Sequence, residues 1–390
     1  MATKPNEHPV RHASIKRHLA KVDRALDKAI DAAEIPGAVV LARIRRDGEV
    51  IEHCSVRGLA SSRPERIAMA RETVFDLASL TKVLATTTAF MRLVEQGAVA
   101  LDDPVAKVLP NFAEREKDAV TFRHLLTHSS GLRPLRDFYE PLRERENKTG
   151  ERMLATPAAK AWVIDSICRS ALVHAPGEAG VYGDLDFITL GAAVEQLVGR
   201  PLDEHCTETV YAPLGLTSMR FLPLARELGE AERRTIAATE NCAVREKILW
   251  GEVHDPNCWA MGGVAGHAGL FATADDVLKF GQTLIDVWHG RSDAFPRGRL
   301  AEFATRQNLP AGSDWALGWD TPAAQGSSAG TLFSRASIGH LGFTGTSLWV
   351  DLDAECVVAL LTNRIHLVVK RSKFSLRAEI HDLVREAFAE

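Results

Sequence analysis

The chain lacks several features that mark special classes of protein. It has no long hydrophobic run, and residues 1–21 are polar and basic with no apolar stretch behind them, so we expect neither a membrane span nor an export signal. An excess of positive charge is also missing, because 47 basic and 51 acidic residues give a net charge of −4. That balance argues against a nucleic-acid partner. Together these absences predict a cytoplasmic protein.

Paired cysteine spacings are missing as well. The six cysteines do not form the short pairs of a zinc site or a dithiol motif; they are Cys54, Cys168, Cys206, Cys242, Cys258 and Cys356. We interpret them as buried or incidental thiols, which fits a reducing compartment. The sequence therefore predicts no metal site, and nothing in it calls for a cofactor.

The composition that is present is that of a globular protein with a large core. Of the 390 residues, 46% are hydrophobic and 25% are charged, both near the average for folded domains. This length suits one two-lobed unit or two ordinary domains. The length does not distinguish these two organisations, so we turn to the periodicity of the apolar residues.

The first part of the chain reads as a helix followed by a hairpin. Apolar residues at helical spacing predict a helix over 14–33, which Pro36-Gly37 ends. Residues 38–46 and 49–58 are rich in strand formers and are joined by Asp47-Gly48, a dipeptide suited to a tight turn. We expect an antiparallel sheet covered on one face.

The remainder is helical in the middle and β-rich near the end. A helix is predicted over 81–96 with Gly97 as its cap, and residues 101–311 mix short helices with loops that contain proline and glycine. Strand patterns return, and a last helix follows; the predicted ranges are 316–319, 337–340, 346–351 and 356–362 for strands and 372–388 for the helix.

These patterns predict one α/β (α+β) unit spanning residues 1–390. Residues 14–80 and 314–390 would build an antiparallel sheet flanked by the terminal helices. Residues 81–313 would form a mostly helical lobe inserted between them.

The first candidate for chemistry is Ser-Leu-Thr-Lys at residues 79–82. On a helix, Ser79 and Lys82 share a face, so the lysine can take the hydroxyl proton if burial keeps its amine neutral. The helix N-terminus adds positive potential and free N–H groups where an oxyanion would form. The motif alone is weak, because a capping serine and a solvated lysine would look the same.

The second candidate is Tyr182-Gly183-Asp184, which lies between Pro176-Gly177 and a predicted helix over 185–198. Tyr182 can hold or relay the proton that Lys82 receives, while Asp184 orients the substrate or the lysine. The alternative is an aromatic residue packed at a loop corner.

The third candidate is the glycine-rich segment 338–345, at the edge of a predicted strand. Small residues beside His340 would let a substrate backbone lie along the strand, and the Phe343 N–H could serve as an oxyanion donor together with that of Ser79. The alternative is a glycine bulge with a surface histidine.

In this order and at these separations, the three motifs resemble the serine β-lactamase and penicillin-binding protein family. The resemblance is to its class C-like branch, which also holds esterases and peptidases, and it extends from about residue 15 to 387. Residues 125–132 and Pro176-Gly177 are similar to further family landmarks. It implies a β-lactamase/transpeptidase-like fold and an acyl-enzyme on Ser79.

The same resemblance implies roles for the other motif residues. Lys82 and Tyr182 would carry protons, Asp184 would orient them, and His340 with Gly342 would line the strand side. Two residues depart from the pattern: Asp184 replaces asparagine and His340 replaces lysine. A mostly neutral histidine attracts a substrate carboxylate less well than lysine does, and Asp184 should raise the pKa of Lys82.

Residues 253–257 and 262–271 resemble a subgroup that includes cytoplasmic amidases acting on N-acetylmuramyl peptides. A recycled muropeptide is therefore one expected substrate. Two other interpretations fit poorly: His254-Asp255 lacks the nearby partners of a metal site, and the glycines lack the strand, loop and lysine of a phosphate-binding loop. We expect these glycines to shape a loop beside the catalytic pocket.

The leading hypothesis is a serine hydrolase that cleaves an amide or ester, with a small molecule or muropeptide as partner. A promiscuous carboxylesterase, a D-alanyl-D-alanine carboxypeptidase and a weak β-lactamase stay as alternatives. A non-catalytic ligand-binding or sensor protein on the same fold is the alternative of another class. We set aside an unrelated triad hydrolase, because we identify no Gly-x-Ser-x-Gly elbow that would hold its serine. The oligomeric state stays unknown.

Overall fold

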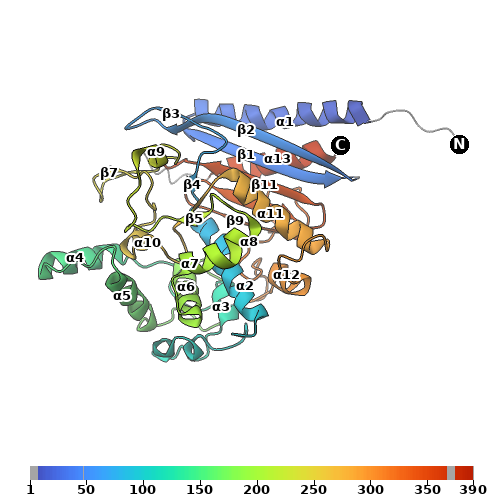
Figure 1. Cartoon of the computed structure of the whole chain (residues 1–390). Coiled ribbons are helices and arrows are strands. Elements are labelled where there is room, and N and C mark those ends of the chain that lie inside the picture. Colours follow the sequence, from blue (N-terminus) through green and yellow to red (C-terminus); the bar gives the residue numbers. More distant parts are fainter. Residues whose placement is uncertain (1–7, 47, 367–373, 390) are drawn as a thin grey trace.

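The computed structural model describes all residues except 1–7, 47, 367–373 and 390. A six-stranded antiparallel sheet with the strand order β3-β2-β1-β11-β10-β9 occupies the upper half of Figure 1. Its strands are β1 (Gly37–Arg46), β2 (Glu49–Ser61), β3 (Ile67–Ala68), β9 (Ser337–Leu341), β10 (Ser347–Asp351) and β11 (Cys356–Thr362).

The two ends of the chain meet in this sheet. β1 pairs with β11 in a register that sets Ala38 opposite Thr362 and Ile44 opposite Cys356. Both central strands are apolar and buried, whereas β2 pairs with the other edge of β1 and exposes alternate residues. The predicted hairpin and three of the four predicted late strands are therefore confirmed. Asp47 of the predicted turn lies outside the described residues.

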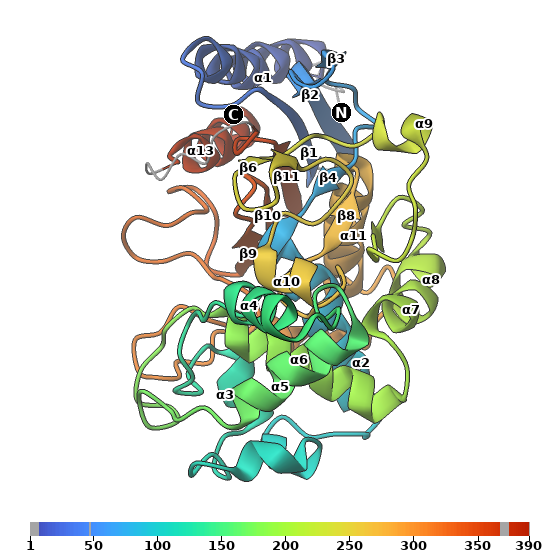
Figure 2. The ribbon, with the colours of Figure 1, turned by 90° about the vertical axis from the view of Figure 1, so that its left-hand side faces the viewer.

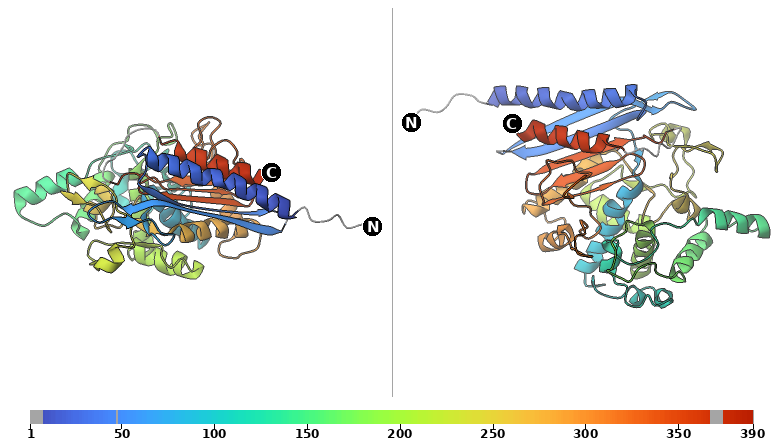
Figure 3. Two further views of the ribbon diagram at one scale, coloured as in Figure 1. Left: turned by 90° about the horizontal axis from the view of Figure 1, so that it is seen from above. Right: turned by 180° about the vertical axis from the view of Figure 1, so that it is seen from behind.

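Helices cover both faces of the sheet. α1 (His8–Asp31) and α13 (Leu376–Ala389) lie side by side on one face (Figure 3). α11 (Ala274–Trp288) packs on the opposite face (Figure 2), where Gly281 brings it close to Val350 and Val357. The expectation of one covered face is wrong, because a sheet whose central strands are apolar on both sides needs two covering layers.

The other strands are short and form two further small sheets. β4 (Phe75–Asp76), β8 (Leu270–Ala272) and β5 (Arg220–Phe221) form one small sheet, and β6 (Asn241–Cys242) pairs with β7 (Lys247–Ile248). The remaining α-helices of the described chain are α2 (Thr88–Glu95), α3 (Phe122–Leu126), α4 (Tyr139–Thr149), α5 (Pro157–Cys168), α6 (Asp184–Val198), α7 (Leu202–Cys206), α8 (Ala212–Leu214), α9 (Glu230–Arg233), α10 (Pro256–Ala260) and α12 (Arg297–Ala304).

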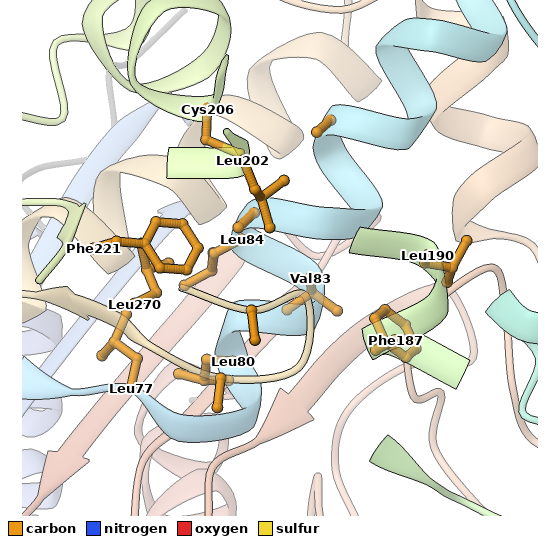
Figure 4. Packing of buried hydrophobic residues seen from close by; sticks show 14 of the residues in the cluster. Leu77, Leu80, Val83, Leu84, Phe187, Leu190, Leu202, Cys206, Phe221 and Leu270 are labelled. Carbon is orange, nitrogen blue, oxygen red and sulfur yellow. The ribbon is translucent and has the colours of Figure 1, made fainter. Parts of the chain in front are cut away.

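A buried helix carries the Ser-x-x-Lys motif through the centre of the molecule. It begins as a 3₁₀ turn (Ala78–Leu80), continues as a π-helical segment (Lys82–Thr87) and ends as α2 before Gly97. Leu80, Val83 and Leu84 pack against apolar side chains from several other elements (Figure 4). The helix predicted over 81–96 is confirmed, and its widened first turns are of a kind that often occurs at functional sites.

One predicted strand and the start of one predicted helix need correction. Residues 316–319 do not form a strand, because Gly318 has a φ of +81° and interrupts the extended backbone. The last helix begins at Leu376, and residues 372–373 of its predicted start lie outside the described chain. The division into two lobes stays a prediction, although α11 of the middle segment packs on the sheet. None of the described helices is long and apolar enough to cross a membrane.

Candidate active site

Ser79 and Lys82 meet at the start of the central helix. The Lys82 Nζ donates hydrogen bonds to Ser79 Oγ at 3.0 Å and to Asp184 Oδ1 at 2.7 Å. The His267 carbonyl accepts a third at 3.4 Å. The Lys82 side chain is 0% exposed, so these protein groups, and not solvent, surround its ammonium.

The charge of Lys82 is set by two opposing effects. Burial lowers its pKa, but the negative charge of Asp184, together with Tyr182 and the hydrogen bonds that Lys82 donates to both, raises the pKa by more. The result is a pKa above the ordinary lysine value. The sequence-based expectation that Asp184 raises the Lys82 pKa agrees with this direction, and burial does not make the amine neutral.

The backbone just before Ser79 is held in an unusual conformation. Ala78 has a φ of +47°, which is costly for a residue with a Cβ. Its N–H donates to Asp76 Oδ1 at 2.9 Å, and the other oxygen of Asp76 accepts from the His254 N–H at 2.7 Å. Asp76 is buried, and burial raises its pKa. These contacts fix the turn that presents Ser79 to the cavity.

Tyr182 lies on the loop before α6 and stands over the lysine. The Lys82 Nζ is 5.0 Å from the centre of its ring. The ring also contacts His128 at 4.7 Å, stacks with Trp315 at 5.7 Å, and is 41% exposed. Aromatic neighbours thus fix the ring while part of it stays open to the cavity.

Behind Tyr182 lies a buried group of three polar residues. Ser130 Oγ donates to Asp186 Oδ1 at 2.5 Å, and Asp186 Oδ2 lies 3.1 Å from His128 Nδ1. Burial raises the pKa of Asp186 to about 8, and burial with the charge of Lys82 lowers the pKa of His128 to about 3. Since Nδ1 also accepts from the Gly183 N–H, we assign the proton of the pair to Asp186.

The strand side of the site is formed by the end of β9. His340 is buried, and burial lowers its pKa well below the ordinary value. Its Nδ1 donates to the Leu341 carbonyl at 2.8 Å, which leaves Nε2 as an acceptor. A side chain at Gly342 would lie 2.4 Å from the Leu77 carbonyl oxygen, so only glycine fits there. Phe343 is 56% exposed and stacks on His254.

Residues 254–268 contribute a further wall. His267 is buried, and its Nε2 lies 2.9 Å from Asp255 Oδ1. Burial raises the Asp255 pKa, but the charge of His267 and this hydrogen bond lower it by more, so the carboxyl pKa is below its usual range. The segment lies beside the catalytic pocket, as the sequence analysis expected.

Among the described residues, Asp184, Asp255 and His267 are the three metal-ligand side chains that approach one another, within 4.8 Å. Their donor set of two carboxylates and an imidazole could hold a divalent cation. Lys82 already supplies a cation to Asp184, and His267 is paired with Asp255. The polar groups are thus matched within the protein without an ion.

One cavity of about 540 Å³ collects the sequence-predicted residues. Ser79, Tyr182, Asp184, His340, Gly342 and Phe343 line it, and Lys82 lies directly behind Ser79. Three lining residues escaped sequence reasoning: Trp315, Asp320 and Arg377. Asp320 is nearly buried, and burial raises its pKa to about 6. No motif marks these three positions: Trp315 and Asp320 lie on one loop before β9, and Arg377 lies on α13.

A Gly-x-Ser-x-Gly sequence does occur, at residues 326–330, so the prediction that the chain has no such motif is wrong. Ser328 lies in a loop with no strand before it and no helix after it. Its hydroxyl donates to Asp320 Oδ2 at 3.2 Å. The strained strand-to-helix turn of a nucleophile elbow is absent from this part of the described chain.

Comparison with known proteins agrees with this fold. The family model described as Beta-lactamase matches residues 22–381. The chain therefore belongs to the β-lactamase family, and it is a serine hydrolase with the β-lactamase/transpeptidase fold. The sequence-based prediction of the family, the fold class and an enzyme is confirmed.

Individual relatives share about a third of the aligned residues with this chain. The chain is 33% identical over 315 residues to a protein of Escherichia coli (strain K12) named "Putative D-alanyl-D-alanine carboxypeptidase", covering 75% of this chain and 70% of that one. A namesake from Escherichia coli O157:H7 is 32% identical over 375 residues, with coverages of 89% and 82%.

Among solved structures, "EstCE1, a hydrolase with promiscuous acyltransferase activity" is similar with a TM-score of 0.72 at 25% identity, covering 96% of this chain and all (100%) of that one. A class C beta lactamase has a TM-score of 0.70 at 17% identity, with coverages of 96% and 98%. The second likeness supports the fold alone.

Proposed function

We propose that this enzyme cleaves an amide or ester bond through an acyl-enzyme on Ser79. The observation that carries the proposal is the hydrogen bond of 3.0 Å from Lys82 Nζ to Ser79 Oγ, at the wall of a cavity that Tyr182 also lines. The Ser79 oxygen attacks the substrate carbonyl, the amine or alcohol departs, and water then releases the acyl group.

Lys82 acts as an ammonium in this scheme. Because its pKa is raised, it cannot accept the Ser79 proton in the resting enzyme, but it stabilises negative charge that develops on Ser79 Oγ. The Tyr182 phenolate is the proton acceptor: it takes the proton of Ser79 and becomes a neutral phenol, and the nearby ammonium stabilises the phenolate before the transfer. Tyr182 then returns the proton to the leaving group. Asp184 fixes the position and charge of Lys82.

The oxyanion is stabilised by backbone donors. The N–H groups of Ser79 and Phe343 donate to no other group in the described part of the chain, and both residues line the cavity. Neighbouring Gly342 is held by its own hydrogen bond, from its N–H to the Thr346 carbonyl at 2.8 Å. This arrangement holds the donors in place before the reaction begins.

A peptide fragment of the cell wall is the substrate class that we favour. The Escherichia coli relatives are named for D-alanyl-D-alanine carboxypeptidase activity, and residues 253–257 and 262–271 carry the muropeptide-amidase resemblance. In a muropeptide-amidase reaction, the lactyl carboxyl of an N-acetylmuramyl peptide is transferred to Ser79, and the amine of L-alanine leaves. The second candidate is a carboxylesterase, which the likeness to EstCE1 favours.

The test uses the purified enzyme and its Ser79→Ala variant, with Ser292→Ala as a matched control, since Ser292 lies outside the cavity. p-Nitrophenyl acetate reports turnover, a reactive β-lactam reports a stable acyl mass, and N-acetylmuramyl-L-alanine reports amidase activity. We expect wild type and Ser292→Ala to turn over or gain mass, and Ser79→Ala to do neither. Activity should persist in EDTA.

Equal behaviour of all three proteins would refute Ser79 as the nucleophile. Acylation without turnover on any substrate would instead support the ligand-binding or sensor alternative. Ester cleavage without release of alanine would favour the carboxylesterase over the amidase.

A further inference from the structure

A second cavity of about 730 Å³ adjoins the active-site cavity. The two share Leu341 and Arg377 in their walls. Four arginines line the second cavity, and we call it the arginine cavity; they are Arg306, Arg335, Arg364 and Arg377. Asp382 is the one carboxylate among its described lining residues.

The positive charge of this cavity is only partly balanced. Asp382 already accepts hydrogen bonds from the N–H groups of Thr331 and Leu332. Arg306 pairs with Asp314 at 2.7 Å. Arg364 lies 4.4 Å from the centre of the Phe374 ring, which holds its side chain at the cavity wall. An anion entering the cavity would therefore meet a surplus of cations.

Arg377 is the least balanced of the four. It is only 9% exposed, and within the described chain no carboxylate lies within ion-pair distance of it. One guanidinium nitrogen donates to the Gly342 carbonyl, while Nε is buried without a partner. Burial, and then the charge of Arg364, lower its pKa to about 9. It also stands in the first turn of α13, where the helix dipole disfavours a cation.

We propose that the arginine cavity binds an anionic group, a carboxylate or a phosphate, at the end of the substrate remote from the scissile bond. Arg377 joins this subsite to the active-site cavity, since it borders both and touches Gly342 next to the oxyanion donor. The subsite supplies the cation that the neutral His340 does not. This inference rests on the proposed function, because the ligand is the substrate of Ser79.

The first test compares esters that differ only in charge. We would measure kcat/KM for the p-nitrophenyl half-esters of dicarboxylic acids of increasing length and for neutral alkanoate esters of the same length. Acetyl esters of 4-hydroxybenzoate and 4-hydroxybenzamide extend the comparison to the leaving-group side. We expect one anionic ester to be preferred, with about a tenfold or greater loss of that preference in Arg335→Gln and in Arg377→Gln.

Arg145→Gln is the matched control, because Arg145 is an exposed residue of α4 outside both cavities. If Arg377→Gln fails to fold, exposed Arg335 still tests the subsite. The same anionic-to-neutral ratio in wild type, both variants and the control would overturn the proposal.

The second test measures binding without turnover. Titration calorimetry of the Ser79→Ala protein with glutarate, inorganic phosphate and neutral glutaramide separates a carboxylate site from a phosphate site. Binding of either anion that weakens with added salt, and about tenfold with Arg335→Gln, supports the subsite. Binding of neither anion overturns it. Activity retained by Ser79→Ala would refute the proposed function alone, since this titration does not depend on catalysis.

Discussion

At the scale of single residues, the ion pair between Lys82 and Asp184 decides how the site can work. The lysine is buried and the carboxylate is 21% exposed, so solvent screens their attraction little. The raised Lys82 pKa means that the stabilisation is fully present below the ordinary lysine value and is lost only as the pH rises through the higher folded-state value. The pair is therefore intact at neutral pH.

Asp184→Asn tests this pair and restores the residue that is usual in the family motif. Removing the negative charge lowers the Lys82 pKa, so the alkaline limb of the kcat/KM profile should move to lower pH. At pH 7 we expect a loss of about 1–3 kcal/mol in the free energy of unfolding. A pH series of esterase rates and urea denaturation would measure the two effects.

Asp165→Asn is the matched control, because Asp165 pairs with Arg169 on the surface of α5. It should change stability by less than about 1 kcal/mol. An alkaline limb that does not move in Asp184→Asn would contradict the assigned role of Asp184.

At the scale of elements, the loop after α3 is tied to α6 by the buried group around Asp186. The Asp186 pKa of about 8 lies above the ordinary value, so the folded state holds a proton that the unfolded chain releases near pH 4. This group therefore contributes stability at low pH and loses it as the pH rises towards 8. A neutral Asp186 donates to His128, which in turn packs on Tyr182.

Asp186→Asn keeps a neutral hydrogen-bonding side chain, whereas Asp186→Ala leaves Ser130 and His128 without their partner. We expect Asn to have a small effect at pH 7 and to flatten the fall in stability between pH 4 and 8, and Ala to cost about 2–4 kcal/mol. Urea denaturation across that pH range measures both. Equal losses for the two variants would contradict a protonated Asp186.

The contact between α6 and the segment after α10 depends on two glycines. A Cβ at Gly266 would lie 2.0 Å from the Phe187 carbonyl oxygen and 2.9 Å from the Gly191 Cα. Both are backbone atoms that cannot rotate away, so close packing here requires glycine. The contact holds His267 and its neighbours against the site.

Gly266→Ala should lower the free energy of unfolding by about 2 kcal/mol or more and reduce activity, because the His267 carbonyl contacts Lys82. Gly298→Ala on α12 is the comparison, since nothing lies within 4 Å of its added Cβ, and alanine should be neutral or stabilising there. Thermal denaturation of the two variants would show the difference. A stable Gly266→Ala protein would refute this packing account.

At the scale of the whole molecule, α1 and α13 close one face of the sheet with residues from opposite ends of the sequence (Figure 1). Leu26 on α1 and Val384 on α13 are fully buried in the same core cluster. This cluster lies on the far side of the sheet from α11 and the helical half of the molecule (Figure 2). It should therefore affect stability more than chemistry.

Leu26→Ala and Val384→Ala test this separation. We expect a loss of about 2–5 kcal/mol for the leucine, and less for the smaller valine, with kcat/KM per folded molecule close to wild type. Lys28→Ala, an exposed position on the same helix, should change stability little. Chemical denaturation and active-site titration would measure the two quantities. A large fall in kcat/KM of the folded variants would contradict independent roles.

The sequence by itself determined the family, the fold class and the candidates Ser79, Lys82, Tyr182 and His340. Spacing along one helix and short motifs are local properties, so they can be read before the chain folds. The hairpin, the central helix, α6 and three late strands followed from periodicity for the same reason. The strand predicted over 316–319 failed because one glycine with positive φ outweighs the apolar pattern.

Only the tertiary structure decided which distant residues meet and what charge they carry. Trp315 and Asp320 share a loop that is far along the chain from both Ser79 and Arg377, and no local pattern places these residues at one cavity. In the same way, no local pattern shows that α11, from the middle of the sequence, covers the second face of the sheet. The ammonium state of Lys82 depends on complete burial beside a carboxylate from α6, because desolvation and Coulomb attraction act through space and not along the chain.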